Sequence, residues 1–251
     1  MLSVISVDRL VSFAAFEEWL AVPGPWIGGF DLPFGLPREL VVTLGWPTGW
    51  ADLLAHVALL GKSEFKNALN GVREARPMGS RYISRRGDAK AGSSSPMKLV
   101  NPPVGLMFFE GAPRLLAAGV SVVPCCPTTD SRVALEAYPG YVARQITRQS
   151  YKKDGADGRT PARRAQRTAI LRALHDCHAA TSGVEVFIPA SVAQECVDDG
   201  NGDVLDAVLC AVQVAAVAGR TRLDRDSDNV AYGIPDSADP LEGWIATVPD
   251  S

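Results

Sequence analysis

The spacing of hydrophobic residues along the chain predicts helices alternating with short strands. Residues 12–21 place Phe13, Phe16 and Leu20 on one helical face, and Ser12 before them is a suitable N-cap residue. The same periodicity predicts further helices over 49–60, 63–76, 106–118, 161–180 and 203–218. Short apolar runs predict strands over 26–30, 119–124, 132–140, 184–189 and 243–248. Strands interspersed with helices are typical of an α/β fold.

One long stretch, residues 77–98, lacks this periodicity. It is rich in glycine, serine and basic residues, and its only large apolar residues are Met78, Tyr82, Ile83 and Met97. This composition predicts a long, mobile loop. With 251 residues, 47% of them hydrophobic, the chain otherwise has the size and apolar content of a single globular domain spanning residues 1–251.

Neither a membrane span nor a secretion signal is predicted. No apolar run approaches the roughly 20 residues that cross a bilayer, and the first residues of the chain contain no basic segment before an apolar one. The five cysteines show no CxxC spacing, which argues against a disulfide framework and favours a reducing compartment. We therefore expect a cytoplasmic protein with no membrane partner.

Basic residues concentrate in two segments, although the net charge of the chain is −3. Residues 62–98 and 144–172 together hold 18 of the 25 lysines and arginines. Residues 195–251 hold 12 of the 28 acidic residues and only three arginines. Clustered basic charge is typical of proteins with phosphate-rich partners, but it also occurs on ordinary solvated surfaces. Charge alone leaves both interpretations open.

Three acidic residues stand where a predicted element begins or ends. Asp31 follows strand 26–30, Glu136 lies toward the end of strand 132–140, and Asp206 lies in the first turn of helix 203–218. Their apolar neighbours predict partial burial, which costs desolvation energy unless a partner compensates the charge. Carboxylates that converge from different elements can share a divalent cation, and oxygen-only ligation suits Mg²⁺ or Mn²⁺. The pattern therefore indicates a candidate metal site.

Each of these acids also has an ordinary structural interpretation. Asp31 could accept hydrogen bonds from backbone amides of the proline-rich turn that follows it. Glu136 could pair with an arginine such as Arg132 or Arg144. Asp203 and the acid three residues after it have the spacing of a capping box, which needs no function.

Four segments add a resemblance to a known family: GGFDLPFGLPREL at 28–40, MFFEGAPRLLAAGV at 107–120, EAYPGYVAR at 136–144 and GDVLDAVLCAVQVA at 202–215. Together they resemble an uncharacterised bacterial family of predicted nucleases in the ribonuclease H-like superfamily. The likeness runs from about residue 12 to residue 246. Four motifs in the right order are far more specific than any one of them.

The resemblance implies a central mixed sheet flanked by helices, with acidic residues from strands and from a late helix converging on magnesium. In that superfamily two metal ions activate a water and stabilise the leaving oxygen during phosphodiester hydrolysis. Carried over by position, Glu136 is the acid of the middle strand and Asp206 is the acid of the C-terminal helix, with Asp203 nearby. Asp31 belongs to the family's Asp-Leu-Pro-Phe-Gly signature.

The N-terminus departs from the family pattern. Related chains begin with a strand hairpin whose first strand carries an acid, whereas MLSVISVD offers only Asp8, which comes too late to match that position. The resemblance therefore implies a fold lacking the first strand hairpin. Two explanations are open: the gene starts upstream of Met1, or this copy lacks a catalytic ligand. We expect weak cleavage by residues 1–251 and stronger cleavage once an upstream acidic strand is restored.

Two functional hypotheses follow. The first is a magnesium-dependent nuclease in which four carboxylates hold the metal: Asp31, Glu136, Asp203 and Asp206. The second is a non-catalytic nucleic-acid-binding or regulatory protein on the same fold with an incomplete metal site. In both, the basic residues of segment 77–98 contact the phosphate backbone; these are Arg81, Arg85, Arg86, Lys90 and Lys98. The choice between DNA and RNA stays open, as does the oligomeric state.

Overall fold

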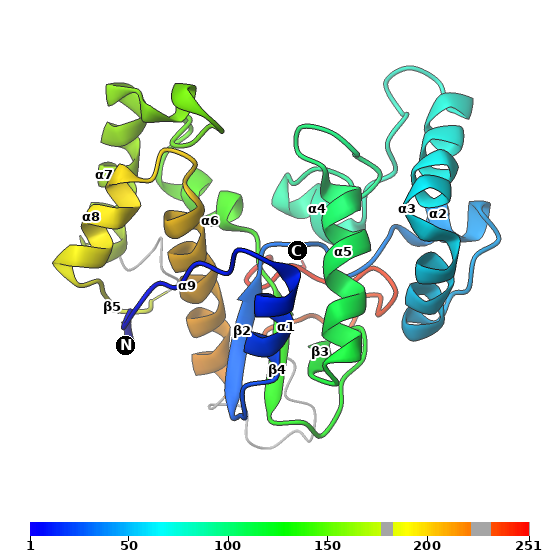
Figure 1. Cartoon of the computed structure of the whole chain (residues 1–251), viewed down its shortest axis with the longest axis horizontal. Coiled ribbons are helices and arrows are strands. Elements are labelled where there is room, and N and C mark those ends of the chain that lie inside the picture. Colours follow the sequence, from blue (N-terminus) through cyan, green and yellow to red (C-terminus); the bar gives the residue numbers. More distant parts are fainter. Residues whose placement is uncertain (177–182, 222–231, 251) are drawn as a thin grey trace.

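The structure is a computed structural model that describes residues 1–176, 183–221 and 232–250. It is a mixed α/β arrangement in which helices surround two small parallel sheets (Figure 1). No helix of the described residues is long and apolar enough to cross a membrane. The α/β class predicted from the hydrophobic pattern is therefore confirmed.

The central sheet has three strands in the order β2-β4-β3, and all of them run parallel. They are β2 (Trp26–Phe30), β3 (Ser121–Val123) and β4 (Arg132–Glu136). Parallel strands are covered on both faces, which explains the continuous apolar run at the centre of β4. The mixed sheet implied by the family resemblance is not seen in the described residues, where every strand of this sheet is parallel.

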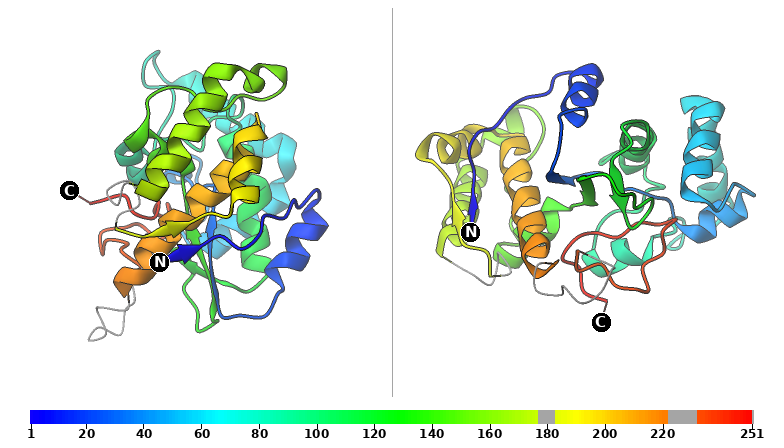
Figure 2. Two further views of the ribbon diagram at one scale, coloured as in Figure 1. Left: turned by 90° about the vertical axis from the view of Figure 1, so that its left-hand side faces the viewer. Right: turned by 90° about the horizontal axis from the view of Figure 1, so that it is seen from below.

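The N-terminal strand belongs to a different sheet. β1 (Leu2–Ser3) pairs in parallel with β5 (Val186–Phe187) at one side of the molecule, as Figure 2 shows. Asp8 lies in the extended segment between β1 and α1, and it does not line the cavity described below. The first residues of the chain therefore supply no acid to the central sheet.

The helices follow the predicted periods and add short ones that the pattern did not predict. Their bounds are α1 (Phe13–Leu20), α2 (Arg38–Thr43), α3 (Trp50–Ala75), α4 (Arg86–Ala91), α5 (Val104–Ala117), α6 (Pro139–Ile146), α7 (Pro161–Asp176), α8 (Ala190–Asp198) and α9 (Asp203–Thr221), with a 3₁₀ turn at Ala156–Arg159.

Two predicted boundaries have clear physical causes. Ser12 caps α1, because its hydroxyl oxygen accepts a hydrogen bond from the amide of Ala15 at 3.1 Å. The helices predicted over 49–60 and 63–76 are the two halves of α3, which is kinked between them at Gly61. The φ of Gly61 is 75°, outside the helical range, so the helix is interrupted at this residue.

The strand predicted over 243–248 is wrong. Only a single bridge forms there, between Ile245 and Glu136. Gly243 and Thr247, on either side of it, have φ angles of 75° and 68°, which interrupt the extended backbone.

The expectation of a long loop over 77–98 is wrong for its centre. This segment contains α4 and buries Ile83 and Met97 in the hydrophobic core. The hydroxyl of Ser95 bonds both residues, because it donates to the carbonyl of Ile83 and accepts from the amide of Met97 at 3.1 Å. These buried contacts hold in place a segment whose composition predicts a mobile loop.

The central sheet separates two groups of core residues, because side chains alternate along each strand. Phe30 and Ala134 belong to the core that includes α1, α3 and α5. Val133 and Leu135 belong to the core that includes Val214 of α9 and the C-terminal segment. A third core lies among α6, α7, α8 and α9. Helix α9 packs against β2, where Gly29 lies beside Cys210 and Val214.

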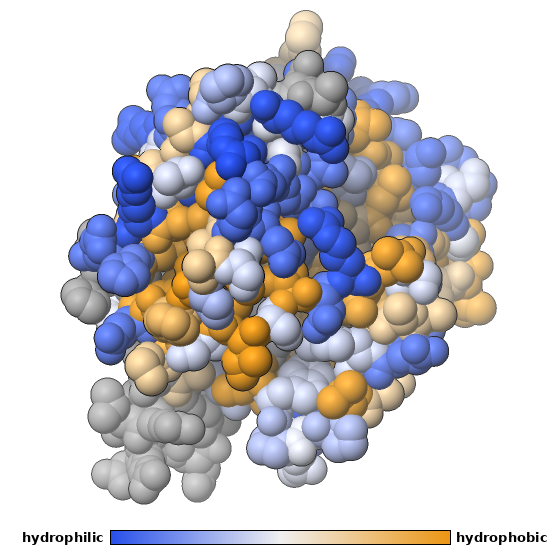
Figure 3. Space-filling model, turned by 60° about the vertical axis from the view of Figure 1, so that its left-hand side comes forward, coloured by the Kyte–Doolittle hydropathy of each residue, from blue (hydrophilic) through white to orange (hydrophobic). Residues whose placement is uncertain are grey.

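Polar and apolar residues are unevenly distributed on the surface. Figure 3 shows hydrophilic residues crowded over the upper part of the molecule and more hydrophobic residues exposed below. The upper part is the end toward which β2 and β4 point in Figure 1. The carboxyl ends of these strands therefore face the more polar end of the molecule.

Gly29 sets the distance between β2 and α9, and its replacement by alanine is expected to destabilise the fold by about 1–3 kcal/mol. An added Cβ would lie 2.6 Å from Cγ2 of Val214 and 2.9 Å from the carbonyl oxygen of Cys210, both on α9. Urea unfolding should show a lower midpoint. The matched control is Gly71→Ala in α3, where no atom lies within 4 Å and the helix should gain about 1 kcal/mol. Equal midpoints for the Gly29 variant and wild type would contradict this account of the packing.

Candidate functional site

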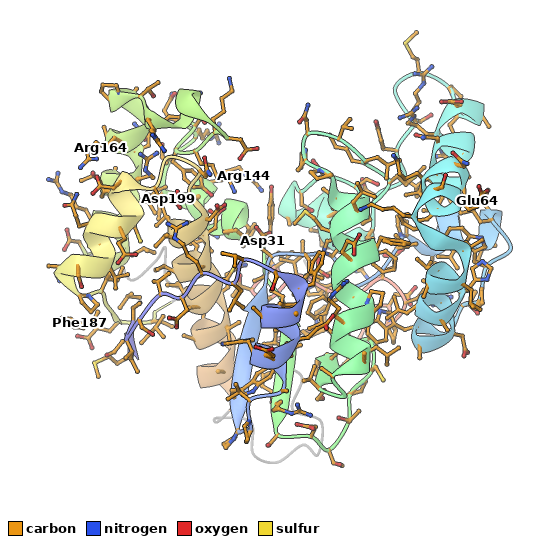
Figure 4. All side chains as sticks on the ribbon, in the orientation of Figure 1. Asp31, Glu64, Arg144, Arg164, Phe187 and Asp199 are labelled. Atoms are coloured by element: carbon orange, nitrogen blue, oxygen red, sulfur yellow. The ribbon has the colours of Figure 1, made fainter. Side chains whose placement is uncertain are left out.

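The carboxyl ends of β2 and β4 open into a cavity of about 1140 Å³. One wall comes from the start of α5, with Pro103 and Met107, and the other comes from α6 and the segment after it, with Arg144 and Arg148. In Figure 4 Asp31 lies near the middle of the molecule, with Arg144 above it. The cavity is therefore placed where ligands bind in parallel α/β sheets, beyond the carboxyl ends of the strands.

All four carboxylates predicted from the sequence line this cavity: Asp31, Glu136, Asp203 and Asp206. Asp31 directly follows β2 and Glu136 ends β4, and these strands are neighbours in parallel register, with Phe30 opposite Glu136. The two aspartates at the start of α9 are three residues apart and share one helical face. The four acids therefore line a common space, and their convergence on a shared cation stays a prediction.

Glu136 is buried and held by an arginine. Its Oε1 accepts from the guanidinium of Arg85 at 2.5 Å, and its Oε2 accepts from the same guanidinium at 2.8 Å and from the amide of Phe34 at 2.9 Å. Burial raises the pKa of Glu136, while the charge of Arg85 opposes that rise. Both oxygens are therefore occupied by protein donors.

The arginine partner of Glu136 is different from either one suggested by the sequence. Arg132 binds Asp130, and Arg144 donates to the hydroxyl of Tyr138 and to a backbone carbonyl of α4. Arg85 also donates to both oxygens of Asp88, each at 2.8 Å. The result is a buried triad of one guanidinium and two carboxylates at the N-terminus of α4.

Asp206 is also paired. Its Oδ1 accepts from the hydroxyl of Tyr151 at 2.7 Å, and its Oδ2 binds the ammonium of Lys152. Burial raises the pKa of Asp206, and Lys152 opposes the rise. The capping-box interpretation is wrong, because α9 is instead capped by Asp199, whose carboxylate accepts from the amide of Val204 at 3.0 Å.

Asp31 differs from both of these acids, because its carboxylate accepts no hydrogen bond from any residue that the structure describes. The turn amide that could have bound it, that of Phe34, donates to Glu136 instead. Asp31 faces the solvent of the cavity, yet the surrounding protein removes part of its hydration. That desolvation, followed by repulsion from Asp206, raises the pKa of Asp31 to about 7.

The donor set suits a hard divalent cation in part. Asp31 and Asp203 both line the cavity, and no described residue donates a hydrogen bond to either carboxylate. With Asp206 they offer the oxygen ligands that Mg²⁺ and Mn²⁺ prefer. Glu136 and Asp206 both have their oxygens engaged, Glu136 by Arg85 and Asp206 by Tyr151 and Lys152. Arg85 is buried whereas the Lys152 side chain is 41% exposed, so of these two acids Asp206 is the one that a cation from the cavity can reach. As the side chains stand, the described residues contain no group of three acids, histidines or cysteines close enough to hold an ion.

Comparison with known proteins gives a family for the chain. The family described as "Protein of unknown function (DUF429)" matches residues 4–228. The chain belongs to DUF429. No curated protein and no solved structure matches it. The matched part of this DUF429 chain includes every acid that lines the cavity, together with Lys152.

The basic residues predicted from segment 77–98 do not form the basic wall of the DUF429 cavity. Arg85 lines the cavity but is 2% exposed and bound to Glu136 and Asp88, which leaves its guanidinium little access to a phosphate. Arg86 and Lys90 bind Asp250 near the C-terminus. None of Arg81, Arg86, Lys90 and Lys98 lines the cavity, and their contact with nucleic acid stays a prediction.

The sequence did contain a signal for the basic residues that do line the cavity. Arg144, Arg148 and Lys152 recur every four residues after Glu136 and belong to the basic segment 144–172. Arg148 is exposed, and its guanidinium shows no hydrogen bond or ion pair to a described residue. Because α6 ends at Ile146, Arg148 and Lys152 lie in irregular backbone where this spacing has no helical meaning, so the signal in the sequence is the basic segment 144–172 itself.

The raised pKa of Asp31 predicts that Asp31→Asn stabilises the DUF429 fold at alkaline pH. The folded protein keeps a proton on Asp31 up to a pKa of about 7, against an ordinary value of 3.8. Between these values the folded state binds more protons than the unfolded chain, so wild-type stability falls as the pH rises. Asparagine does not titrate, so the stability of Asp31→Asn does not fall with rising pH for this reason. Thermal unfolding should show a higher melting temperature than wild type at pH 8 and a difference that shrinks toward pH 4. A variant less stable than wild type at pH 8 would contradict the assigned environment of Asp31.

Proposed function

We propose that this DUF429 chain is a divalent-metal-dependent nuclease that hydrolyses phosphodiester bonds on a ribonuclease H-like fold. One observation supports the proposal most. Carboxylates from two neighbouring parallel strands and from a late helix line one cavity, and one wall of the same cavity carries Arg144 and Arg148. Acids beside cationic side chains are the combination that phosphodiester hydrolysis needs, since phosphate must be held and its leaving oxygen stabilised.

The chain's own residues take separate roles in this proposal. Asp31, Asp203 and Asp206 are the ligands for Mg²⁺ or Mn²⁺, and a bound ion supplies an activated water and charge stabilisation of the leaving oxygen. The two-metal carboxylate mechanism implied by the family resemblance belongs to this proposal. Arg148 is exposed on the cavity wall and is placed to hold a phosphate of the substrate.

Glu136 has an indirect role. Arg85 fixes it, and its Oε2 accepts from the amide of Phe34, in the turn that follows Asp31. Glu136 therefore positions the turn that carries Asp31 instead of meeting the substrate. We assign it as a positioning residue. The nuclease is proposed to act in the cytoplasm, a location supported by five cysteines without a disulfide pattern.

A second function is favoured by a different observation. Arg85 and Lys152 already balance the charges of Glu136 and Asp206, so two of the four acids are compensated by the protein itself. A nucleic-acid-binding or regulatory protein without catalysis would need no metal to compensate the remaining acids. The cationic wall would then bind phosphate while the acids served only the fold.

A cleavage assay separates the two functions. The chain is incubated with single- and double-stranded DNA, RNA and a DNA–RNA hybrid, with Mg²⁺ or Mn²⁺ and, in parallel, with EDTA. We expect cleavage of at least one substrate that EDTA abolishes. Binding to these substrates without cleavage at any metal concentration would favour the second function. If the chain neither binds nor cleaves any of these substrates, both functions are excluded.

The cationic wall makes its own prediction. Replacement of Arg148 by alanine is expected to lower the slope of log affinity against log salt concentration by about one for the bound nucleic acid. The reason is that one phosphate contact releases about one counterion. Arg81→Ala, in the segment outside the cavity, is the matched control and should leave the slope unchanged. Loss of slope for Arg81 alone would place the nucleic acid on segment 77–98 instead.

A further inference from the structure

Lys152 places a positive charge among the acids of the cavity. Its ammonium binds Oδ2 of Asp206, and its charge also interacts with those of Asp31 and Asp203. These are the same three carboxylates that are assigned above as ligands for a cation. The lysine therefore stands where the acids of the cluster would otherwise attract an ion.

The position of this ammonium is fixed by its surroundings. The aliphatic part of Lys152 lies over Gly202, where an added Cβ would be 2.7 Å from Cβ of the lysine, so only glycine fits beneath it. Tyr151, the preceding residue, donates to the other oxygen of Asp206 at 2.7 Å. Neighbouring residues thus engage both oxygens of one carboxylate, and the lysine side chain is still 41% exposed to the cavity.

The charges of the cluster limit how many ions it can hold. The three carboxylates carry three negative charges when ionised, and Lys152 leaves a net charge of two. One divalent cation neutralises that charge. A second would leave the cluster with a net charge of plus two, in a partly desolvated space where uncompensated charge is costly.

We propose that the Lys152 ammonium occupies one cation position of this carboxylate cluster, so that removing its charge adds one bound divalent ion. The inference rests on the proposed function and changes one part of it: the site uses one divalent ion and one resident ammonium in place of the two metal ions that the family resemblance implies. The ammonium supplies the second positive charge facing the phosphate, and it does so without depending on the metal concentration.

The test is the number of Mn²⁺ ions bound per chain, measured at pH 8 by electron paramagnetic resonance of the unbound ion during titration. Wild type is expected to bind one ion, and Lys152→Met is expected to bind two. Methionine keeps the aliphatic stem over Gly202 while removing the charge. Lys152→Gln is the second neutral variant, and circular dichroism checks that each variant is folded.

Two controls retain the charge at the site. Lys152→Arg should bind one ion, as wild type does, because a cation remains beside Asp206. Lys62→Met removes a lysine of similar exposure that is paired with Glu110 on the outside of α3, and it should also bind one ion. A second ion in the Lys62 variant would show that the extra binding follows from net charge alone, which would overturn the proposal.

The remaining outcomes separate the inference from the proposed function. An equal number of ions in wild type and in both neutral variants overturns the inference, and cleavage by wild type can still support the nuclease. If wild type binds no ion and Lys152→Met binds one, the inference is supported, because the ammonium then fills the cation position of the cluster. The same result overturns metal-dependent catalysis by the natural chain. Two ions in wild type overturn the inference and leave the two-metal mechanism in place.

Discussion

Arg85→Ala is expected to lower the free energy of unfolding by about 3–5 kcal/mol, the largest effect on stability among the variants considered. The guanidinium is 2% exposed and is the shared partner of Asp88 and Glu136, and it also donates to the carbonyl of Glu242 at 2.8 Å. Alanine would leave two buried carboxylates without their counter-charge. Urea unfolding monitored by circular dichroism measures the loss.

The control for Arg85→Ala is an arginine of the same charge on the surface. Arg164 binds Asp198, and both side chains are about half exposed. Its replacement by alanine should cost less than about 1 kcal/mol, since exposed ion pairs contribute little. Arg85→Lys should fall between the two, because an ammonium keeps the charge but cannot bond two carboxylates in the planar geometry of guanidinium. Equal effects for Arg85 and Arg164 would show that the buried triad does not stabilise the fold.

Asp31→Asn is expected to lower the rate of metal-dependent cleavage by about a hundredfold or more. The change removes an anionic ligand from the proposed site, and a loss of about 2.7 kcal/mol of transition-state stabilisation already gives that factor. Single-turnover cleavage under saturating protein measures the chemical step. Binding of the nucleic acid should be unchanged or tighter, because one negative charge facing the phosphate is removed.

Asp52→Asn is the matched control, an exposed aspartate in the first turn of α3 that does not line the cavity. Its cleavage rate should equal that of wild type. The combination expected for Asp31→Asn, a more stable fold at pH 8 with greatly reduced cleavage, is characteristic of a residue kept for function at a cost in stability. Wild-type cleavage by Asp31→Asn would remove this residue from the catalytic group.

Much of the fold was predictable because long apolar periods and capping residues are local signals. Ser12 and the spacing after it were sufficient for α1, and five apolar-rich residues before Asp31 were sufficient for β2. The strand predicted over 243–248 failed for a reason that the pattern cannot show. Its backbone is determined by contact with the end of β4, where the amide of Ala246 donates to the carbonyl of Glu136 at 2.8 Å.

The acids of the candidate site were predictable, but their partners were not. Each carboxylate stood at the end of an element, and parallel strands bring such ends together. The partners are distant in sequence, as Arg85 is 51 residues from Glu136 and Tyr151 is 55 residues from Asp206. The composition of segment 77–98 predicts a solvated loop whose arginines face a phosphate, whereas Arg85 is buried beside Glu136.

The contacts that enclose the site join parts of the chain that are far apart in sequence, and this affects how fast the protein folds. Phe34 and Glu136 are 102 residues apart, and Arg38 and Glu242 are 204 apart. Contacts over such separations close large loops before they gain any stabilisation, which slows folding more than it lowers stability. We therefore expect the cavity to assemble late on the folding pathway, after the helices and their local contacts. Weakening these contacts should mainly speed unfolding, because interactions formed after the transition state act on that rate.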